Sequence, residues 1–180
     1  MSTAPAAKAI ILRGPPAVGK STVRDLILAH VGAAGRYINL DAHWGIGEWR
    51  YADSAFRYAD LHLATEPVLV MELAWGEPPD FSFPGATRGA NEWVDVLRQA
   101  GRQIYAFLLT ADWHEIVTRL IARHGHPLAA MNQIGRASFY EHHHHYFMYP
   151  VIAGFTEQTI DTTGRSEQEV ADEVRKAAGL

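Results

Sequence analysis

The 180-residue sequence contains no cysteine. Disulfides, thiolate zinc sites and cysteine nucleophiles are therefore excluded. Basic residues are also in the minority: 16 lysines and arginines stand against 20 aspartates and glutamates, and the formal net charge is −4. Because a phosphate backbone selects a basic protein surface, we do not expect a nucleic-acid partner.

Long apolar runs are absent as well. No stretch approaches the roughly 20 apolar residues that a membrane-spanning helix needs. Residues 1–7 lack the charged segment and apolar core of a signal peptide. We therefore expect a cytoplasmic protein with no membrane association, and the length predicts a single domain over 1–180.

The most informative segment that is present lies at residues 14–21, where GPPAVGKS is a complete GxxxxGK[ST] phosphate-binding loop. An apolar run precedes the loop and a helical pattern follows it. A strand that turns tightly into a helix N-terminus presents backbone N–H groups to nucleotide phosphates. Lys20 would reach the β- and γ-phosphates, and the hydroxyl of Ser21 would ligate Mg²⁺. The residues that we expect to bind the nucleotide here are Gly14, Pro15, Pro16, Ala17, Val18, Gly19, Lys20, Ser21 and Thr22.

Strand and helix patterns alternate along the rest of the chain. The predicted strands are 9–12, 37–41, 68–71, 103–109 and 158–161, and the predicted helices include 51–65, 92–99, 112–124 and 167–177. Such alternation implies right-handed crossovers and a parallel sheet that is covered by helices on both faces. We predict a three-layer α/β/α P-loop NTPase fold with a five-stranded parallel sheet.

Motifs of several other phosphate-binding-loop classes are missing. There is no Asn-Lys-x-Asp string, with which GTPases read guanine, and no ABC ATPase signature. Asp-x-x-Gly occurs only at 161–164, after the last predicted strand, so it is not a switch glycine motif. Small kinases are the class that remains.

The sequence resembles the compact P-loop kinases, which include shikimate and gluconate kinases, chloramphenicol phosphotransferase and tunicamycin-resistance-type proteins. The loop lies at the N-terminal end, Arg119 and Arg123 lead into a variable segment, and Thr-Ile-Asp-Thr-Thr-Gly at 159–164 precedes a last helix. The resemblance implies ATP- and Mg²⁺-dependent transfer of the γ-phosphoryl group to a hydroxyl of a small molecule. It also implies a lid at about 124–149, and Thr162 and Gly164 beside the adenine.

Two acidic residues follow predicted strands, at the edge where the carboxyl ends of the strands meet beside the loop. Asp41 would accept a hydrogen bond from the acceptor hydroxyl and take its proton, as an aspartate often does in the related kinases. Its alternative role is to cap the turn that follows. Glu72 would hold Mg²⁺ through water or contact substrate; alternatively, it is a solvated strand terminus.

Arg119 and Arg123 are four residues apart, so both would lie on one helix face. In the related kinases a lid arginine stacks on adenine or grips the transferring phosphate, which implies a catalytic role beside Lys20. The alternative is an ordinary exposed pair. Weaker basic candidates are Arg13, Arg88 and Arg136. The histidine run at 142–145 favours a polar lid helix over a metal site.

Several functions stay open at this point. A metabolite kinase and an antibiotic-modifying phosphotransferase share all of these features. A nucleotide-binding resistance or sensor protein with little turnover is the alternative from another class. A 5′-hydroxyl polynucleotide kinase would share the N-terminal loop and the acid after the second strand, but the acidic balance counts against it.

Overall fold

The computed structural model describes residues 6–39, 63–73, 90–142 and 157–180. Within these ranges no helix is long and apolar enough to cross a membrane. The elements, in chain order, are β1 (Lys8–Arg13), α1 (Lys20–Val31), the short 3₁₀ helix η1 (Gly32–Ala34), β2 (Gly35–Asn39), β3 (Val68–Leu73), α3 (Ala90–Gln99), β4 (Gln103–Thr110), α4 (Trp113–His124), α5 (Pro127–His142), β5 (Gln158–Asp161) and α7 (Glu167–Ala178).

The five strands form one sheet in the order β2-β3-β1-β4-β5, and every pair is parallel. The chain leaves β1 toward the β2 edge, whereas it leaves β4 toward the β5 edge. Neighbouring strands whose connections depart in opposite directions create a crevice at their carboxyl ends. The predicted phosphate-binding loop follows β1 directly and therefore begins at this crevice.

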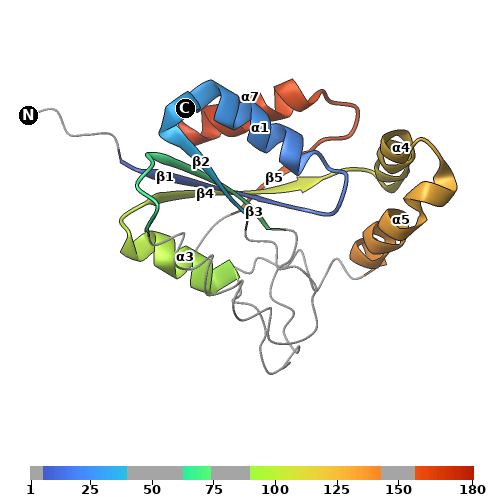
Figure 1. Ribbon diagram of the computed structural model, residues 1–180, viewed down its shortest axis with the longest axis horizontal. Coiled ribbons are helices and arrows are strands. Elements are labelled where there is room, and N and C mark those ends of the chain that lie inside the picture. Colours follow the sequence, from blue (N-terminus) through green and yellow to red (C-terminus); the bar gives the residue numbers. More distant parts are fainter. Residues whose placement is uncertain (1–5, 40–62, 74–89, 143–156) are drawn as a thin grey trace, which may run out of the picture.

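Helices cover both faces of the sheet, with α1 and α7 on one face and α3 on the other (Figure 1). Side chains of β1 alternate between the two layers: Ile10 and Leu12 join the core under α1 and α7, while Ala9 and Ile11 join the core under α3. All four are at most 2% exposed. Burial on both faces explains why this strand is a continuous apolar run.

Helices α4 and α5 contact each other at the end of the sheet toward which β4 points (Figure 1). Ile116 and Leu120 of α4 and Ala130 of α5 complete the core on that side. α5 begins at Pro127, a first-turn position where the missing N–H costs little. The Gly and Pro residues after 124 predict an irregular start to this segment, whereas the structure is helical over Pro127–His142.

The last helix begins as its sequence predicted. The side chain of Ser166 accepts a hydrogen bond from the backbone of Glu169, and the Glu169 carboxylate accepts one from the backbone N–H of Ser166 at 2.8 Å. The Ser-x-x-Glu spacing at 166–169 predicts this capping box, and the structure confirms it. The helical pattern over 51–65 predicts Leu63 on the core side, but Leu63 is 75% exposed and its neighbour Ala64 packs against the core. The rest of the helix predicted for 51–65 lies largely outside the described residues.

Candidate phosphate-binding site

The loop after β1 has a backbone that only particular residues tolerate. Gly14 has φ 133°, and a Cβ atom there would overlap the carbonyl oxygen of Leu109 in β4. Gly19, the N-cap of α1, is left-handed with φ 95°. Ala17 is also left-handed, with φ 66°, a conformation that costs a non-glycine residue about 1–2 kcal/mol. Mixed left- and right-handed backbones of this kind turn N–H groups toward a common anion.

Lys20 lies within the loop that it would serve. It opens α1, it is 8% exposed, and its ammonium group donates hydrogen bonds to the carbonyl oxygens of Gly14 at 2.7 Å and Pro15 at 3.0 Å. The positive end of the α1 dipole and this ammonium group therefore point at the same small region. An anion bound there would meet backbone donors and a fixed cation together.

Ser21 and Glu72 meet beside the loop. The Ser21 hydroxyl donates a hydrogen bond to Oε2 of Glu72 at 3.1 Å, which joins the first turn of α1 to β3. Glu72 is 6% exposed and β3 continues to Leu73, so the interpretation of Glu72 as a solvated strand terminus is wrong. Pairing of Leu73 with Arg13 of β1 keeps the strand going past the acid.

These two side chains fit Mg²⁺. Because the Ser21 proton is directed at Glu72, the lone pairs of its hydroxyl oxygen remain available to a cation, and Ser21 itself is exposed. Hydroxyl and carboxylate oxygens are hard donors, and Mg²⁺ is usually held by one or two such groups together with phosphates and water. Among the described residues no group of three or more acidic or histidine side chains could hold a metal ion by itself.

Arg24 is a site residue that the sequence analysis missed. Its Nη1 donates to Oε1 of Glu72 at 2.6 Å, its Nε donates to Asp25 at 2.8 Å, and its guanidinium lies 4.3 Å from the centre of the Tyr37 ring. The hydrogen bond to Asp25 raises the pKa of Arg24 above its ordinary value, burial opposes this, and Glu72 adds to the increase. The available signal was the three-residue spacing from Ser21, which places both on one helix face.

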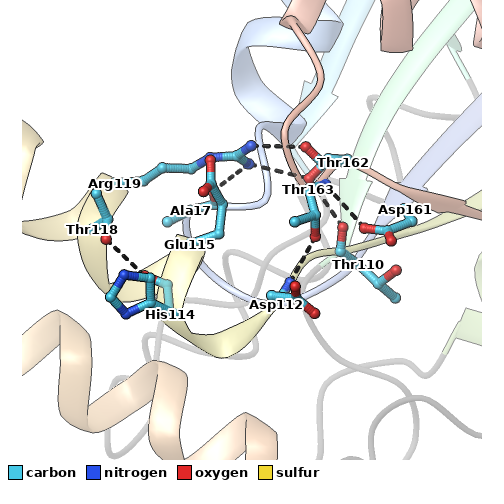
Figure 2. A network of polar contacts seen from close by, with 10 residues as sticks. All are labelled: Ala17, Thr110, Asp112, His114, Glu115, Thr118, Arg119, Asp161, Thr162 and Thr163. Carbon is cyan, nitrogen blue, oxygen red and sulfur yellow. Dashed lines mark hydrogen bonds and ion pairs between the residues drawn. The ribbon is translucent and has the colours of Figure 1, made fainter.

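Arg119 links three segments (Figure 2). Its guanidinium donates to the backbone oxygen of Thr162 at 2.8 Å and to the Thr162 hydroxyl at 3.1 Å. It also reaches the carbonyl oxygen of Ala17 in the loop at 3.4 Å, while its Nε pairs with Glu115 at 3.0 Å. The structure thus brings together Arg119, Thr162 and the loop, which the sequence analysis had identified separately.

The turn after β5 is fastened to the start of α4 (Figure 2). The backbone N–H of Asp112 donates to the Thr163 hydroxyl at 2.9 Å, and the Thr163 N–H donates to Asp161 at 2.9 Å. The hydrogen bonds from Thr163 lower the pKa of Asp161 below its ordinary value. Gly164 completes the turn with φ 65°, and Thr162 is 2% exposed. The turn has a fixed position relative to the loop through Arg119.

The other predicted residues are less central in the described part of the chain. Arg123 is exposed and makes no hydrogen bond or ion pair with another described residue. Asp41 lies outside the described residues, as do Arg88, the side chain of Arg136 and positions 143–149 of the expected lid.

Arg13, a weak candidate for phosphate binding, has a different partner. It is 1% exposed, and its Nη1 donates to both carboxylate oxygens of Glu157, at 2.8 and 3.0 Å. Burial raises the pKa of Glu157, and the Arg13 charge opposes that increase. The pair connects the end of β1 to the residue before β5, across β4.

Comparison with known proteins shows a likeness of fold to solved structures. No protein-family model and no curated protein matches the sequence. Solved structures share its architecture, although identities are low. A tunicamycin resistance protein from Deinococcus radiodurans has a TM-score of 0.56 and 17% identity, over 97% of this chain and 96% of that one. A gluconokinase from Sinorhizobium meliloti has a TM-score of 0.53 and 14% identity, over 96% and 94%. A sugar kinase from a Janibacter species has a TM-score of 0.53 and 10% identity, over 94% and 93%.

These similarities and the parallel sheet decide the fold. The chain has the three-layer α/β/α P-loop fold. The prediction of a five-stranded parallel sheet with helices on both faces is confirmed. Because the matches cover nearly the whole length of both chains, the likeness extends over almost all of this chain rather than the loop alone.

Proposed function

We propose that this protein transfers the γ-phosphoryl group of ATP to a hydroxyl group of a small molecule, with Mg²⁺ as cofactor. The observation that carries the proposal is the contact between Ser21 and Glu72 beside the loop that holds Lys20. It unites a phosphate-binding backbone, a fixed cation and a pair of hard oxygen donors at the carboxyl edge of the sheet. Phosphoryl transfer depends mainly on such positioning and charge neutralisation.

Different groups of the loop would bind different parts of the triphosphate and its Mg²⁺. Backbone N–H groups of 14–19 and the α1 N-terminus would bind the phosphate oxygens. Lys20 would exchange its hydrogen bonds with the Gly14 and Pro15 carbonyls for the β- and γ-phosphates. Ser21 would ligate Mg²⁺ while it donates its proton to Glu72, so that Glu72 orients Ser21 and would contact the cation's water. The bound cation would neutralise charge on the phosphate oxygens.

The adenine and the lid would lie on the side of the site that α4 and the turn after β5 form. Thr162 and Gly164 would lie along the adenine, and Arg119 would keep this turn aligned with the loop through its bonds to Thr162 and Ala17. Arg123, which is exposed on the same helix, would approach the transferring phosphate when a lid formed by about 124–149 closes.

Asp41 remains the proposed acceptor-side residue. β2 ends at Asn39, which pairs in register with Glu72 of β3, and Asp41 follows two positions later in the sequence. A carboxylate there would orient the acceptor hydroxyl and take its proton as transfer completes. The acceptor itself would be a metabolite, a nucleoside or an antibiotic.

The test is a coupled assay of ADP release with Mg-ATP and a panel of nucleosides, sugars and hydroxylated antibiotics. We expect one class of acceptor to stimulate ADP release in the wild-type protein, and Lys20→Ala and Asp41→Ala to abolish that stimulation. Asp41→Ala should keep nucleotide affinity, because the residue acts on the acceptor. Tight ATP binding without stimulation by any acceptor would contradict the proposal and would indicate a binding or sensor protein.

A further inference from the structure

The carboxylate of Glu72 is engaged on both of its oxygens. Oε2 accepts the hydrogen bond from Ser21 at 3.1 Å, and Oε1 accepts the charged hydrogen bond from Arg24 at 2.6 Å. The ion pair is largely removed from solvent, since the two side chains are 18% and 8% exposed. Charge-assisted bonds of this length are among the stronger hydrogen bonds in proteins. Glu72 therefore has a fixed orientation and a cation in direct contact.

The guanidinium of Arg24 is itself held in place. One turn of α1 separates it from Ser21, its central carbon lies over the Tyr37 ring of β2, and its Nε is bonded to Asp25. An arginine stacked on an aromatic ring and bonded through its fork loses little further entropy when it binds a carboxylate. The positive charge beside Glu72 is therefore a permanent part of the site.

The fixed guanidinium of Arg24 would repel a divalent metal ion that binds at Ser21 and Glu72. In the nucleotide-free protein Arg24, which pairs with the exposed Asp25 as well as with Glu72, opposes the negative charge of Glu72, so a lone divalent cation is attracted less than by Glu72 alone and meets a repelling neighbour. Nucleotide phosphates supply several negative charges and reverse this balance. The same arginine that orients Glu72 would thus make metal binding depend on the nucleotide.

We propose that Arg24 is a positioning residue that holds Glu72 against Ser21 and opposes its charge, so that the site accepts a divalent cation only together with nucleotide phosphates. This inference rests on the proposed function, because it concerns the same nucleotide and metal site. It predicts a gain of binding on mutation, which damage to the fold cannot produce.

The experiment measures Mn²⁺ binding to the full-length protein from the electron paramagnetic resonance signal of free Mn²⁺, with and without ADP, each relative to a protein-free sample with the same Mn²⁺ and ADP. Without nucleotide, Arg24→Met should bind Mn²⁺ about tenfold more tightly than the wild type, since removal of one unit charge close to a divalent cation changes its affinity by about that factor. Arg24→Lys, which keeps the charge, should resemble the wild type. Adding Glu72→Gln to Arg24→Met should remove the gain.

A matched control is Arg98→Met, which deletes an equal charge from the exposed Arg98–Asp95 pair of α3. It should leave Mn²⁺ binding unchanged. Arg24→Gln serves as a second variant, with circular dichroism to confirm folding of each protein. The proposal is overturned if Arg24→Met and Arg24→Gln bind Mn²⁺ no better than the wild type, or if the gain persists without Glu72.

Failure of the proposed function would give a different result. In that case the wild-type protein would bind no Mn²⁺ even in the presence of ADP, whatever residue occupies position 24. Nucleotide-dependent Mn²⁺ binding in the wild type, combined with nucleotide-independent binding in Arg24→Met, supports both conclusions separately.

Discussion

Arg119→Met should weaken both the fold and nucleotide binding, because this arginine joins α4 to the loop and to the turn after β5. The substitution removes hydrogen bonds to the Thr162 carbonyl, the Thr162 hydroxyl and the Ala17 carbonyl, at 2.8, 3.1 and 3.4 Å. Methionine keeps much of the apolar stem of arginine, so the substitution tests the loss of the guanidinium alone and not the loss of packing.

The expected loss of stability depends on how far the hydrogen bonds of Arg119 are exposed to solvent. A hydrogen bond to a charged group contributes about 1.5–3 kcal/mol, and solvent screening of a partly exposed arginine favours the lower end. The Arg119 side chain is 24% exposed. We expect a loss of about 2 kcal/mol in the free energy of unfolding for the set of bonds. For a domain of this size that corresponds to a fall in Tm of about 4–8 °C.

Thermal unfolding and calorimetric titration with Mg-ADP measure the two effects. If Arg119 aligns the turn with the loop before the nucleotide arrives, its loss should weaken Mg-ADP affinity about tenfold. Arg119→Lys should fall between the wild type and Arg119→Met, because lysine keeps the charge without the fork. Arg123→Met should leave Tm unchanged, since that side chain is exposed. Unchanged Mg-ADP affinity in Arg119→Met would refute the alignment role.

Two further substitutions test the loop and the sheet. Gly14→Ala should lower the free energy of unfolding by about 3 kcal/mol in chemical denaturation, because a Cβ atom there overlaps the Leu109 carbonyl and the backbone has a positive φ. Gly101→Ala also has a positive φ, 70°, but its Cβ atom meets open space, so it should cost about 1 kcal/mol. Equal losses in the two variants would contradict the close approach of Gly14 to Leu109. Glu157→Gln should cost about 3–5 kcal/mol in the free energy of unfolding, because it removes the carboxylate charge that is bonded to the buried guanidinium of Arg13. The double replacement Arg13→Met/Glu157→Leu should recover most of that loss.

The loop and the sheet were predictable because local sequence determines them. Ile10 and Ile11 are buried on opposite faces of one strand, and a parallel sheet covered on both faces favours such an uninterrupted apolar run. The spacing of glycines in the loop follows from left-handed backbone at Gly19 and close contact at Gly14. The capping box of Ser166 and Glu169 involves only neighbouring residues, and it formed as its sequence indicates.

The contacts that complete the site were not predictable, since they join residues distant in the sequence. Arg24 and Glu72 are 48 residues apart and Arg119 and Thr162 are 43 apart, so their pairing depends on strand order. An arginine on an amphipathic helix has the same local pattern whether it faces solvent or a buried carboxylate. The helical periodicity of 51–65 predicts Leu63 in the core, whereas Leu63 is exposed and its neighbour Ala64 packs against the core.

The central claim is that the loop binds nucleotide phosphates together with Mg²⁺ held through Ser21. Calorimetric titration of the wild type with ATP, in the presence of Mg²⁺ and again in excess EDTA, tests it directly, beside Lys20→Met and Ser21→Ala. The account predicts tight binding with Mg²⁺, weaker binding in EDTA, loss of both in Lys20→Met, and loss of only the Mg²⁺-dependent part in Ser21→Ala. ATP affinity that is indifferent to Mg²⁺ in every protein, or no ATP binding by the wild type, would contradict it.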